Sequence, residues 1–252
     1  MTTINDIMEY FETFAPLSTQ VEYDNSGLLV GDKNSAVTKV LVSLDITEEV
    51  VKEAEKLGCE LIISHHPVIF NPIRHISTHD PAYLLANKDI AALCMHTNLD
   101  LGTKFGVNVA LANAIGVQDP KLSNIGECLF VGTLDCAVNM QIFAQNVKTA
   151  LKCDGLRYTD TNKNVKTVAV SSGAGGSNVT EAALLGADVL VTGEIKHHEI
   201  NAANQIGINI IDAGHFKSED IVILPLIKRL SDEFSDIIFT KSISYSDFIK
   251  FA

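Results

Sequence analysis

The sequence predicts an α/β protein made of two similar α/β lobes with mixed or parallel sheets. Short apolar runs alternate with segments of helical periodicity along almost the whole chain. The apolar runs are continuous, which is typical of strands that are buried on both faces of a sheet. The chain has 252 residues, enough for one large domain or two modest ones at about 100–200 residues each.

The first half of the chain is predicted to begin with a helix, because Ile4, Ile7 and Phe11 recur at helical spacing. Thr47 is expected to cap a second helix, and Gly58 to end it. The expected helices span about 3–14, 47–58, 80–88 and 105–116, and the expected strands span about 39–45, 60–64 and 90–95.

The second half continues the same alternation after a cluster of turn-forming residues at 118–126. We therefore expect a first α/β lobe at 1–125 and a second at 126–252. The stretch 236–252 is strand-like and then irregular, and we expect it to pack back on the first lobe. The expected strands span about 127–134, 165–171, 188–192 and 208–212, and the expected helices span about 139–151, 178–186, 197–205 and 218–233.

An internal repeat supports two related lobes. Residues 53–66 align with residues 181–194, and each segment reads as a helix, a glycine, an acidic residue, an apolar strand and a polar pair. Further on, His96–Asp100 corresponds to His215–Glu219, because each is a His-x-x-x-carboxylate that follows an apolar strand. The alternative is a chance match between common α/β patterns.

Composition and charge exclude several classes of protein. The net charge of −12, without a block of Lys or Arg, makes nucleic acid an unlikely partner. The chain contains no run of about 18 uncharged apolar residues, so no membrane span is expected. The N-terminus lacks the pattern of a secretory signal. The five cysteines form no C-x-x-C pair, so we expect apolar thiols in a reducing cytoplasm.

Polar side chains at the ends of the predicted strands suggest a metal site. In open α/β sheets, ligands bind at the carboxyl ends of the strands. Imidazoles with carboxylates suit Zn, Mn, Fe, Co or Ni rather than Ca. If the two lobes face each other, the candidate ligands converge in one cleft on two divalent ions per chain. The candidate ligands are His65, His66, Asp100, His215 and Glu219.

Each motif also has an ordinary structural interpretation. An isolated His-His pair is often structural or exposed, and a His-x-x-x-Glu spacing on a helix is often a surface i,i+4 pair. The joint occurrence of paired motifs at strand ends in matching lobes favours the metal site.

Other residues near these motifs have open alternatives. His96 and Glu194 are the candidate catalytic residues, which would move protons or orient ligands, and structural roles remain the alternative. The same alternatives apply to His197 and His198. The glycine-rich segment 171–177 is compatible with a phosphate cradle and with a plain tight turn.

The turn that follows the first helix is also ambiguous. Asp24 and Asn25 would either shape the wall of the cleft or form an Asx turn in which Gly27 has a positive φ.

Several motifs in order give a resemblance to a known family. The motifs are DNSGLLVG at 24–31, SHHP at 64–67, HTNLD at 96–100, TGE at 192–194 with His197 and His198, and DAGHFKSE at 212–219. From about residue 4 to 245, the chain resembles the Nif-three-like family, also described as GTP cyclohydrolase I type 2 homologues. The chain is similar to the compact form, because it is too short for the domain that some members insert. Tyr23 stands where the family often has Trp. An aromatic ring remains at this position, so we expect the packing to survive, and the change bears on local contacts with the substrate.

The resemblance implies two interlinked lobes, a dinuclear metal site in the cleft and a toroidal homohexamer. The ligands of the family fall on the same five residues that the strand-end argument selects.

The function that this resemblance implies is metal-dependent hydrolysis. A nucleotide or a related phosphorylated or heterocyclic molecule is the expected substrate, and GTP cyclohydrolase-like activity is implied by the family name alone. The alternative is a non-enzymatic protein that binds or delivers metal, or a scaffold whose metals hold the lobes together.

Overall fold

The computed structural model describes residues 1–252 and divides them into two units that are interlinked along the sequence. The first unit comprises Met1–Gly102 and Ile223–Ser246, and the second comprises Thr103–Val222 and Asp247–Ala252. The division therefore falls earlier than the expected boundary at 118–126. The reason is that helix α5 (Val107–Ala114) packs Leu111 and Ala112 into the core of the second unit.

The first unit is built on a five-stranded mixed sheet. The strand order is β1-β4-β3-β2-β11, and every neighbouring pair is parallel except β1 with β4. Because β11 pairs with β2, the segment 223–246 belongs to the first unit. The strands are β1 (Gly27–Val30), β2 (Lys39–Ser43), β3 (Leu61–Ser64), β4 (Ala91–Cys94) and β11 (Ile238–Lys241).

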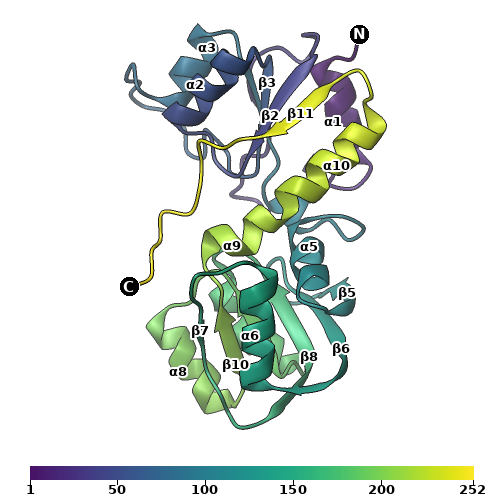
Figure 1. Ribbon diagram of the computed structural model, residues 1–252, viewed down its shortest axis with the longest axis vertical. Coiled ribbons are helices and arrows are strands. Elements are labelled where there is room, and N and C mark those ends of the chain that lie inside the picture. The colour runs from purple at the N-terminus through teal and green to yellow at the C-terminus, as the bar shows by residue number, and fades with distance from the viewer. The chain divides into compact units, whose positions relative to one another are not determined.

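Helices cover both faces of this sheet. Figure 1 shows α2 and α3 on one side of the sheet and α1 and α10 on the other. Thr47 caps α2 by accepting from the N–H of Val50, and Gly58 ends it at φ 68°, as predicted. The helices are α1 (Ile4–Glu12), α2 (Glu48–Leu57), α3 (Pro81–Asn87), the short α4 (Thr97–Asp100) and α10 (Ile223–Glu233).

The second unit is built on a six-stranded mixed sheet with the order β5-β6-β8-β9-β10-β7. The three central strands β8, β9 and β10 are parallel, and the outer pairings are antiparallel. The strands are β5 (Gln118–Leu122), β6 (Phe130–Asn139), β7 (Arg157–Tyr158), β8 (Asn164–Ser171), β9 (Val189–Thr192) and β10 (Asn209–Asp212).

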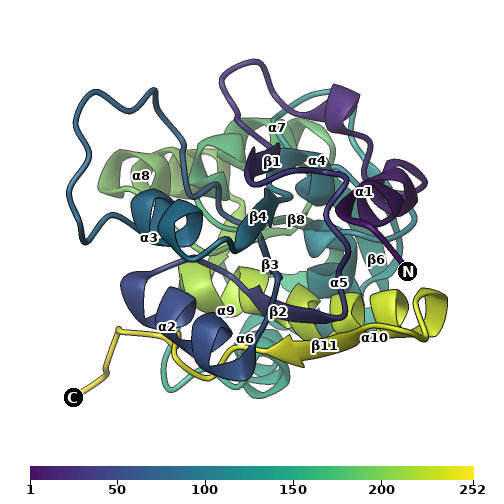
Figure 2. The same cartoon turned by 90° about the horizontal axis from the view of Figure 1, so that it is seen from above.

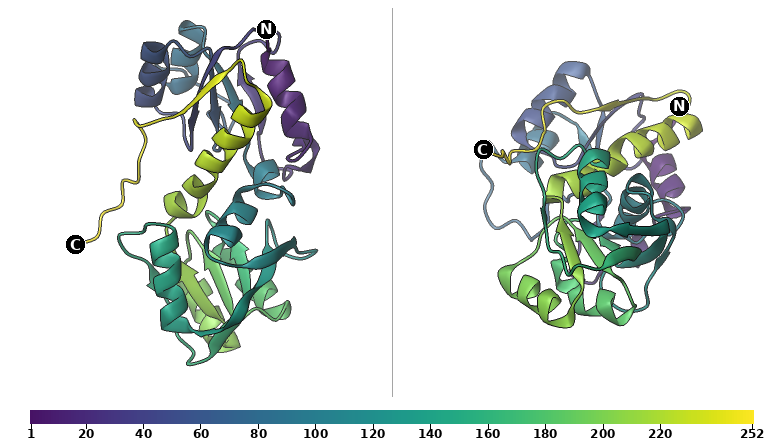
Figure 3. Two further views of the ribbon diagram at one scale, coloured as in Figure 1. Left: turned by 45° about the vertical axis from the view of Figure 1, so that its right-hand side comes forward. Right: turned by 60° about the horizontal axis from the view of Figure 1, so that its bottom comes forward.

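The helices of the second unit also lie on both faces of their sheet. Figure 3 shows α6 (Met140–Ala150) along one face, where its Phe143 and Val147 join the same buried cluster as α5. The opposite cluster contains residues of α7 (Val179–Leu184) and α8 (His197–Ile206). The predicted α/β class with two mixed sheets is confirmed.

The helix expected at 218–233 is interrupted. The structure has α9 (His215–Glu219), a 3₁₀ turn at Asp220–Val222 and then α10. Pro225 lies in the first turn of α10, where it lacks the N–H that a continuous helix would use to bond the preceding turn.

The turn-rich stretch at 118–126 contains an edge strand that the sequence pattern did not reveal. The pairing of β5 with β6 is irregular between Gln118 and Lys121. Asp119 has φ 48°, and Pro120 donates no hydrogen bond, which only an edge strand tolerates.

The internal repeat corresponds to a repeated structural device. Glu60 precedes β3, and its Oε2 accepts hydrogen bonds from the N–H groups of Thr38 (3.2 Å) and Lys39 (2.8 Å) on the neighbouring strand. Asp188 precedes β9, and its Oδ2 accepts from the N–H groups of Lys166 (2.9 Å) and Thr167 (2.8 Å). The acidic residue of the repeat therefore fixes the start of an adjacent strand in both units.

No helix has the length and apolar character that crossing a membrane would need.

Candidate metal centre

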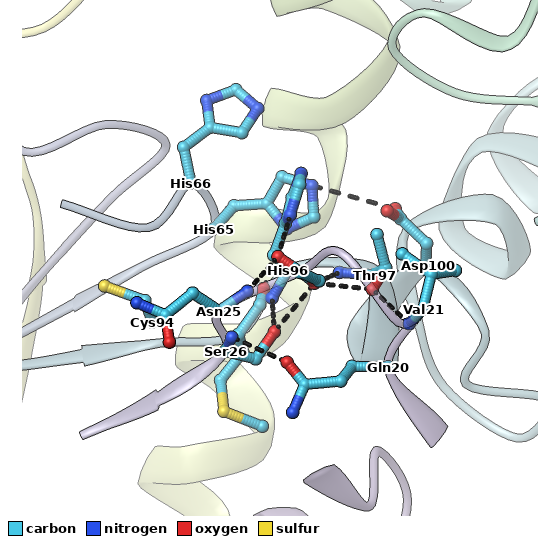
Figure 4. Close-up of polar contacts among 12 residues, drawn as sticks. Gln20, Val21, Asn25, Ser26, His65, His66, Cys94, His96, Thr97 and Asp100 are labelled. Atoms are coloured by element: carbon cyan, nitrogen blue, oxygen red, sulfur yellow. Dashed lines mark hydrogen bonds and ion pairs between the residues drawn. The ribbon is translucent and has the colours of Figure 1, made fainter. Parts of the chain in front are cut away.

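Three histidines gather at the carboxyl ends of parallel strands in the first unit. His65 and His66 directly follow β3, and His96 follows β4. The ring nitrogens that these three histidines offer as ligands all lie within 4.8 Å of one another. Figure 4 shows His65 and His96 together, with Asp100 on the next helical turn. Because β3 and β4 are parallel neighbours, their ends bring the three rings to one edge of the sheet.

His65 is held in a defined orientation. It is 1% exposed, and its Nδ1 lies 2.8 Å from the carbonyl oxygen of Met95. A carbonyl only accepts, so Nδ1 carries the hydrogen and Nε2 presents a lone pair. That Nε2 lies 3.7 Å from Oδ1 of Asp100, which is only 7% exposed. Two ligand atoms that share one first-row metal at about 2.0–2.2 Å lie about 3–4 Å apart, so this spacing fits a metal.

The other two histidines of the first unit also have a carboxylate at Nδ1. Nδ1 of His66 lies 3.0 Å from Oδ1 of Asp45, and Nδ1 of His96 lies 2.7 Å from Oδ1 of Asp24. An oxygen acceptor at Nδ1 fixes the ring and raises the basicity of the remaining nitrogen. All three rings therefore carry the kind of contact that typically supports a metal-binding histidine.

Asp24 is the centre of a hydrogen-bond network that positions His96. Its Oδ2 accepts from the Oγ of Ser26 (3.0 Å) and from both the N–H and the hydroxyl of Thr97. Burial by itself raises the pKa of Asp24, but the hydrogen bonds from His96 and Thr97 outweigh it and hold that pKa well below its usual value. The carboxylate is therefore ionised and can only accept.

The second unit holds a matching group at the end of β10. His215 begins α9, its Nδ1 lies 2.8 Å from Oε1 of Glu194, and its Nε2 lies 3.0 Å from Oε2 of Glu219. Glu219 is one helical turn further along and 4% exposed, whereas Glu194 is exposed. A buried carboxylate beside an imidazole nitrogen is a donor pair for a divalent ion, and Glu194 occupies the orienting position at Nδ1.

A glycine makes room for this pair. Gly173 has φ 57°, and a Cβ there would overlap the carboxylate of Glu219 and lie 3.2 Å from Nε2 of His215. Its N–H donates to the Oγ of Ser218 at 3.0 Å, which in turn donates to the carbonyl of His215 at 2.8 Å. The loop after β8 is thus shaped around the two donor side chains.

Three backbone N–H groups of the glycine-rich segment 171–177 donate to partners within the protein. The N–H of Ser172 donates to Oδ1 of Asn108 at 2.8 Å, and the N–H of Gly176 donates to the carbonyl of Glu194 at 3.1 Å. Together with the bond from Gly173 to Ser218, these contacts favour the tight-turn interpretation over the phosphate cradle.

Comparison with known proteins places the chain in a family. The family described as Duf34/NIF3 (NGG1p interacting factor 3) matches residues 2–248. The chain belongs to the Duf34/NIF3 family. A Clostridium perfringens member named GTP cyclohydrolase 1 type 2 homolog is 33% identical over 261 residues, covering 98% of this chain and 99% of that protein.

Solved structures agree with this Duf34/NIF3 assignment. The crystal structure of a Staphylococcus aureus hypothetical protein matches with a TM-score of 0.91 at 28% identity, covering 99% of each chain. A Bacillus cereus protein related to NIF3 matches with a TM-score of 0.88 at 26% identity, covering 100% of this chain and 99% of that one.

The donor groups of this Duf34/NIF3 chain fit a divalent transition metal. Each unit offers imidazole nitrogen together with a buried carboxylate, the combination that Zn, Mn, Fe, Co and Ni accept and that Ca does not favour. A buried carboxylate is costly without a cation or hydrogen bonds to balance its charge. A metal-binding function is therefore supported in this chain.

The structure sorts the predicted site residues by unit. In the first unit His65, His66 and Asp100 lie with His96, and in the second unit His215 and Glu219 lie with Glu194. The convergence of the two groups on shared ions stays a prediction. His197 and His198 are exposed at the start of α8.

Two carboxylates of the first unit have a role that the sequence argument did not assign. Asp45 lies just beyond the carboxyl end of β2, so the strand-end criterion that selected His65 also applied to it. Asp24 follows no strand, and only the folded chain brings it to His96.

Proposed function

We propose that the protein binds two divalent metal ions and uses them to hydrolyse a nucleotide or a related phosphorylated or heterocyclic substrate. The observation that carries this proposal is the group of three histidines, each with an oxygen at Nδ1, at the carboxyl edge of the first sheet. The relatives named GTP cyclohydrolase 1 type 2 homolog point to the nucleotide class of substrate.

The proposed ligands come from both units. His65, His66 and Asp100 would hold metal from the first unit, and His215 and Glu219 would hold it from the second. The repeat supports a shared site, because both units present an imidazole and a carboxylate at the ends of parallel strands. When bound, such ions supply Lewis-acid activation of water and of the scissile group.

The remaining polar residues have separate proposed roles. His96 is the acid–base residue, because Asp24 fixes its Nδ1 and leaves Nε2 to exchange a proton with the substrate. Glu194 holds the imidazole ring of His215 by accepting a hydrogen bond from its Nδ1–H. The same carboxylate is placed to accept the proton from Nδ1. Loss of His96 should abolish turnover with the metals retained, whereas loss of Glu194 should also weaken metal binding at His215.

Metal analysis of purified variants tests the ligand assignment. We expect about two first-row metal ions per chain in the wild type and the loss of at least one in Glu219→Ala and in Asp100→Asn. His79→Ala is the matched control, because His79 is an exposed histidine of the first unit that pairs with Glu48 and is not a proposed ligand. Full occupancy in Glu219→Ala would contradict the assignment.

Turnover measurements test the hydrolase assignment. A panel of nucleotides and phosphoesters is assayed with Mn, Zn, Fe or Co supplied, and activity should disappear in His65→Ala and Asp100→Asn. Activity that persists unchanged in both variants would belong to a contaminant. Metal retention without any turnover would instead favour the non-enzymatic role in metal binding or delivery.

We also propose that the chain self-associates into a ring of six. The proposal rests on the resemblance to the family and is tested by light scattering of the purified protein. A mass near six times 27.3 kDa supports it, and a monomer at micromolar concentration contradicts it.

A further inference from the structure

The loop between β3 and α3 presents large apolar side chains to solvent. It begins directly after His66, and Phe70 and Ile73 are 42% and 45% exposed. Figure 2 shows this loop extending well away from the helices α2 and α3. Apolar side chains exposed beside a polar site are typical of a surface that binds a ligand.

Phe70 is the member of this loop that reaches the histidine group. Its ring centroid lies 6.2 Å from that of His96, and the two rings are nearly perpendicular at 82°. Such edge-to-face pairs are favourable and fix the relative position of both rings. Phe70 is therefore placed beside the proposed acid–base residue while much of its surface stays exposed.

The same turn that orients His96 also holds this loop. Nδ2 of Asn25 donates to the carbonyl oxygen of Ile69 at 2.6 Å, next to Phe70 in the chain. The preceding residue, Asp24, contacts Nδ1 of His96. One short segment thus sets the distance between the aromatic ring and the histidines, which is what a substrate-positioning wall requires.

We propose that Phe70 is a specificity-determining residue that stacks on the planar heterocyclic base of the substrate. An exposed aromatic ring binds a nucleobase by stacking and has no means of neutralising a phosphate. A base stacked on Phe70 lies beside His96. The sugar and phosphates of the same nucleotide can then reach the group formed by His65, His66 and His96. This inference rests on the proposed function and adds the group that recognises the substrate.

The absence of tryptophan makes a direct binding test possible. The chain contains no Trp, so Phe70→Trp introduces a single fluorophore at the proposed stacking position. GTP should quench its emission saturably, whereas ribose 5-phosphate and tripolyphosphate, which lack a base, should not. Ile73→Trp is the matched control, because Ile73 lies in the same loop with similar exposure. Equal quenching in the two variants, or by the base-free compounds, would overturn the proposal.

A second pair of variants measures the contribution of the ring to affinity. Phe70→Ala should weaken GTP binding by about tenfold in calorimetry, and Phe70→Tyr should retain it. Both should keep the wild-type metal content and thermal stability, because the side chain is half-exposed. An unchanged dissociation constant in Phe70→Ala would contradict base stacking.

The two proposals fail in different ways. Saturable quenching of Phe70→Trp by GTP without metal-dependent turnover supports base recognition and contradicts the hydrolase. Hydrolysis of a phosphoester without quenching by GTP supports the hydrolase and contradicts base recognition at Phe70.

Discussion

Oδ1 of Asp24 lies 2.7 Å from Nδ1 of His96, although the two residues are 72 positions apart in the chain. The carboxylate is buried and ionised, so it fixes both the orientation of the ring and the nitrogen that carries the hydrogen. The contact joins the turn after the first helix to the end of β4. It therefore links the stability of the first unit to the geometry of the histidine group.

Replacing Asp24 by Asn should damage both properties. The amide loses the charge that attracts the donors on Ser26 and Thr97, so we expect the free energy of unfolding to fall by about 1–3 kcal/mol. Turnover should fall about 10–100-fold, because His96 is no longer held. Urea unfolding and steady-state kinetics measure the two effects.

Asp232→Asn removes a carboxylate from an exposed helical pair and should change neither the free energy of unfolding nor turnover. Wild-type turnover in Asp24→Asn would contradict the positioning role.

Gly173→Ala should disrupt the donor pair of the second unit. The new Cβ would overlap the carboxylate of Glu219, and the left-handed backbone adds strain of about 1 kcal/mol. Gly186→Ala is the matched control, because Gly186 has φ 78° with no atom within 4 Å of an added Cβ. We expect both variants to lose stability in urea, and only Gly173→Ala to lose bound metal. Equal metal content in the two variants would show that the space beside Glu219 is unimportant.

Glu60→Gln should destabilise the first unit in a pH-dependent manner. Burial raises the pKa of Glu60, but the hydrogen bonds from Lys39 and Thr38 outweigh it and place the pKa below its usual value. The carboxylate therefore stabilises the fold above the unfolded-state pKa of about 4.3, and this contribution is lost as the pH falls through the lower folded-state pKa. We expect Glu60→Gln to cost about 1–3 kcal/mol at pH 7 and progressively less below about pH 4.

The control for Glu60 is Glu49→Gln. Glu49 is exposed and pairs only with Lys52 in the same helix, so its removal should cost less than about 1 kcal/mol. Urea unfolding across the pH range compares the two variants. A difference between Glu60→Gln and wild type that stays constant down to pH 2 would contradict the proposed hydrogen bonding.

Removal of metal should lower thermal stability. A ligand present at about 100 times its dissociation constant adds about 2.7 kcal/mol to the folded state, which corresponds to about 5–10 °C in Tm for a chain of this size. Differential scanning calorimetry before and after chelation measures the change. Asp100→Asn should lose most of the metal-dependent shift, and His79→Ala should keep it. A chelator that leaves the wild-type Tm unchanged would mean that the folded chain holds no stabilising ion.

Much of the local structure followed from the sequence. Continuous apolar runs such as 39–45 and 60–64 became buried parallel strands, and Thr47 and Gly58 bound their helix as predicted. These features depend on neighbouring residues, so periodicity and capping chemistry suffice to predict them. The strand-end criterion also selected His65, His66 and Asp100. Polar residues that follow a buried apolar strand lie at the carboxyl end of the sheet, which is where α/β proteins bind ligands.

Other features appear only when distant segments meet. β5 pairs at the edge of its sheet despite Pro120, and helix α5 packs into the second unit although the turn signals suggested a later boundary. Both outcomes depend on which surface is available for burial, and local sequence does not encode this.

The sequence by itself determined the α/β class, the repeated strand ends and the identity of the candidate donors. Tertiary structure alone decided which oxygen stands at each Nδ1, through Asp24, Asp45 and Glu194, and that Phe70 lies against His96. The physical reason is that hydrogen bonds and ring contacts act over a few ångströms, whereas the partners lie 21 or more positions apart in the chain. Only the folded backbone brings such partners within that range.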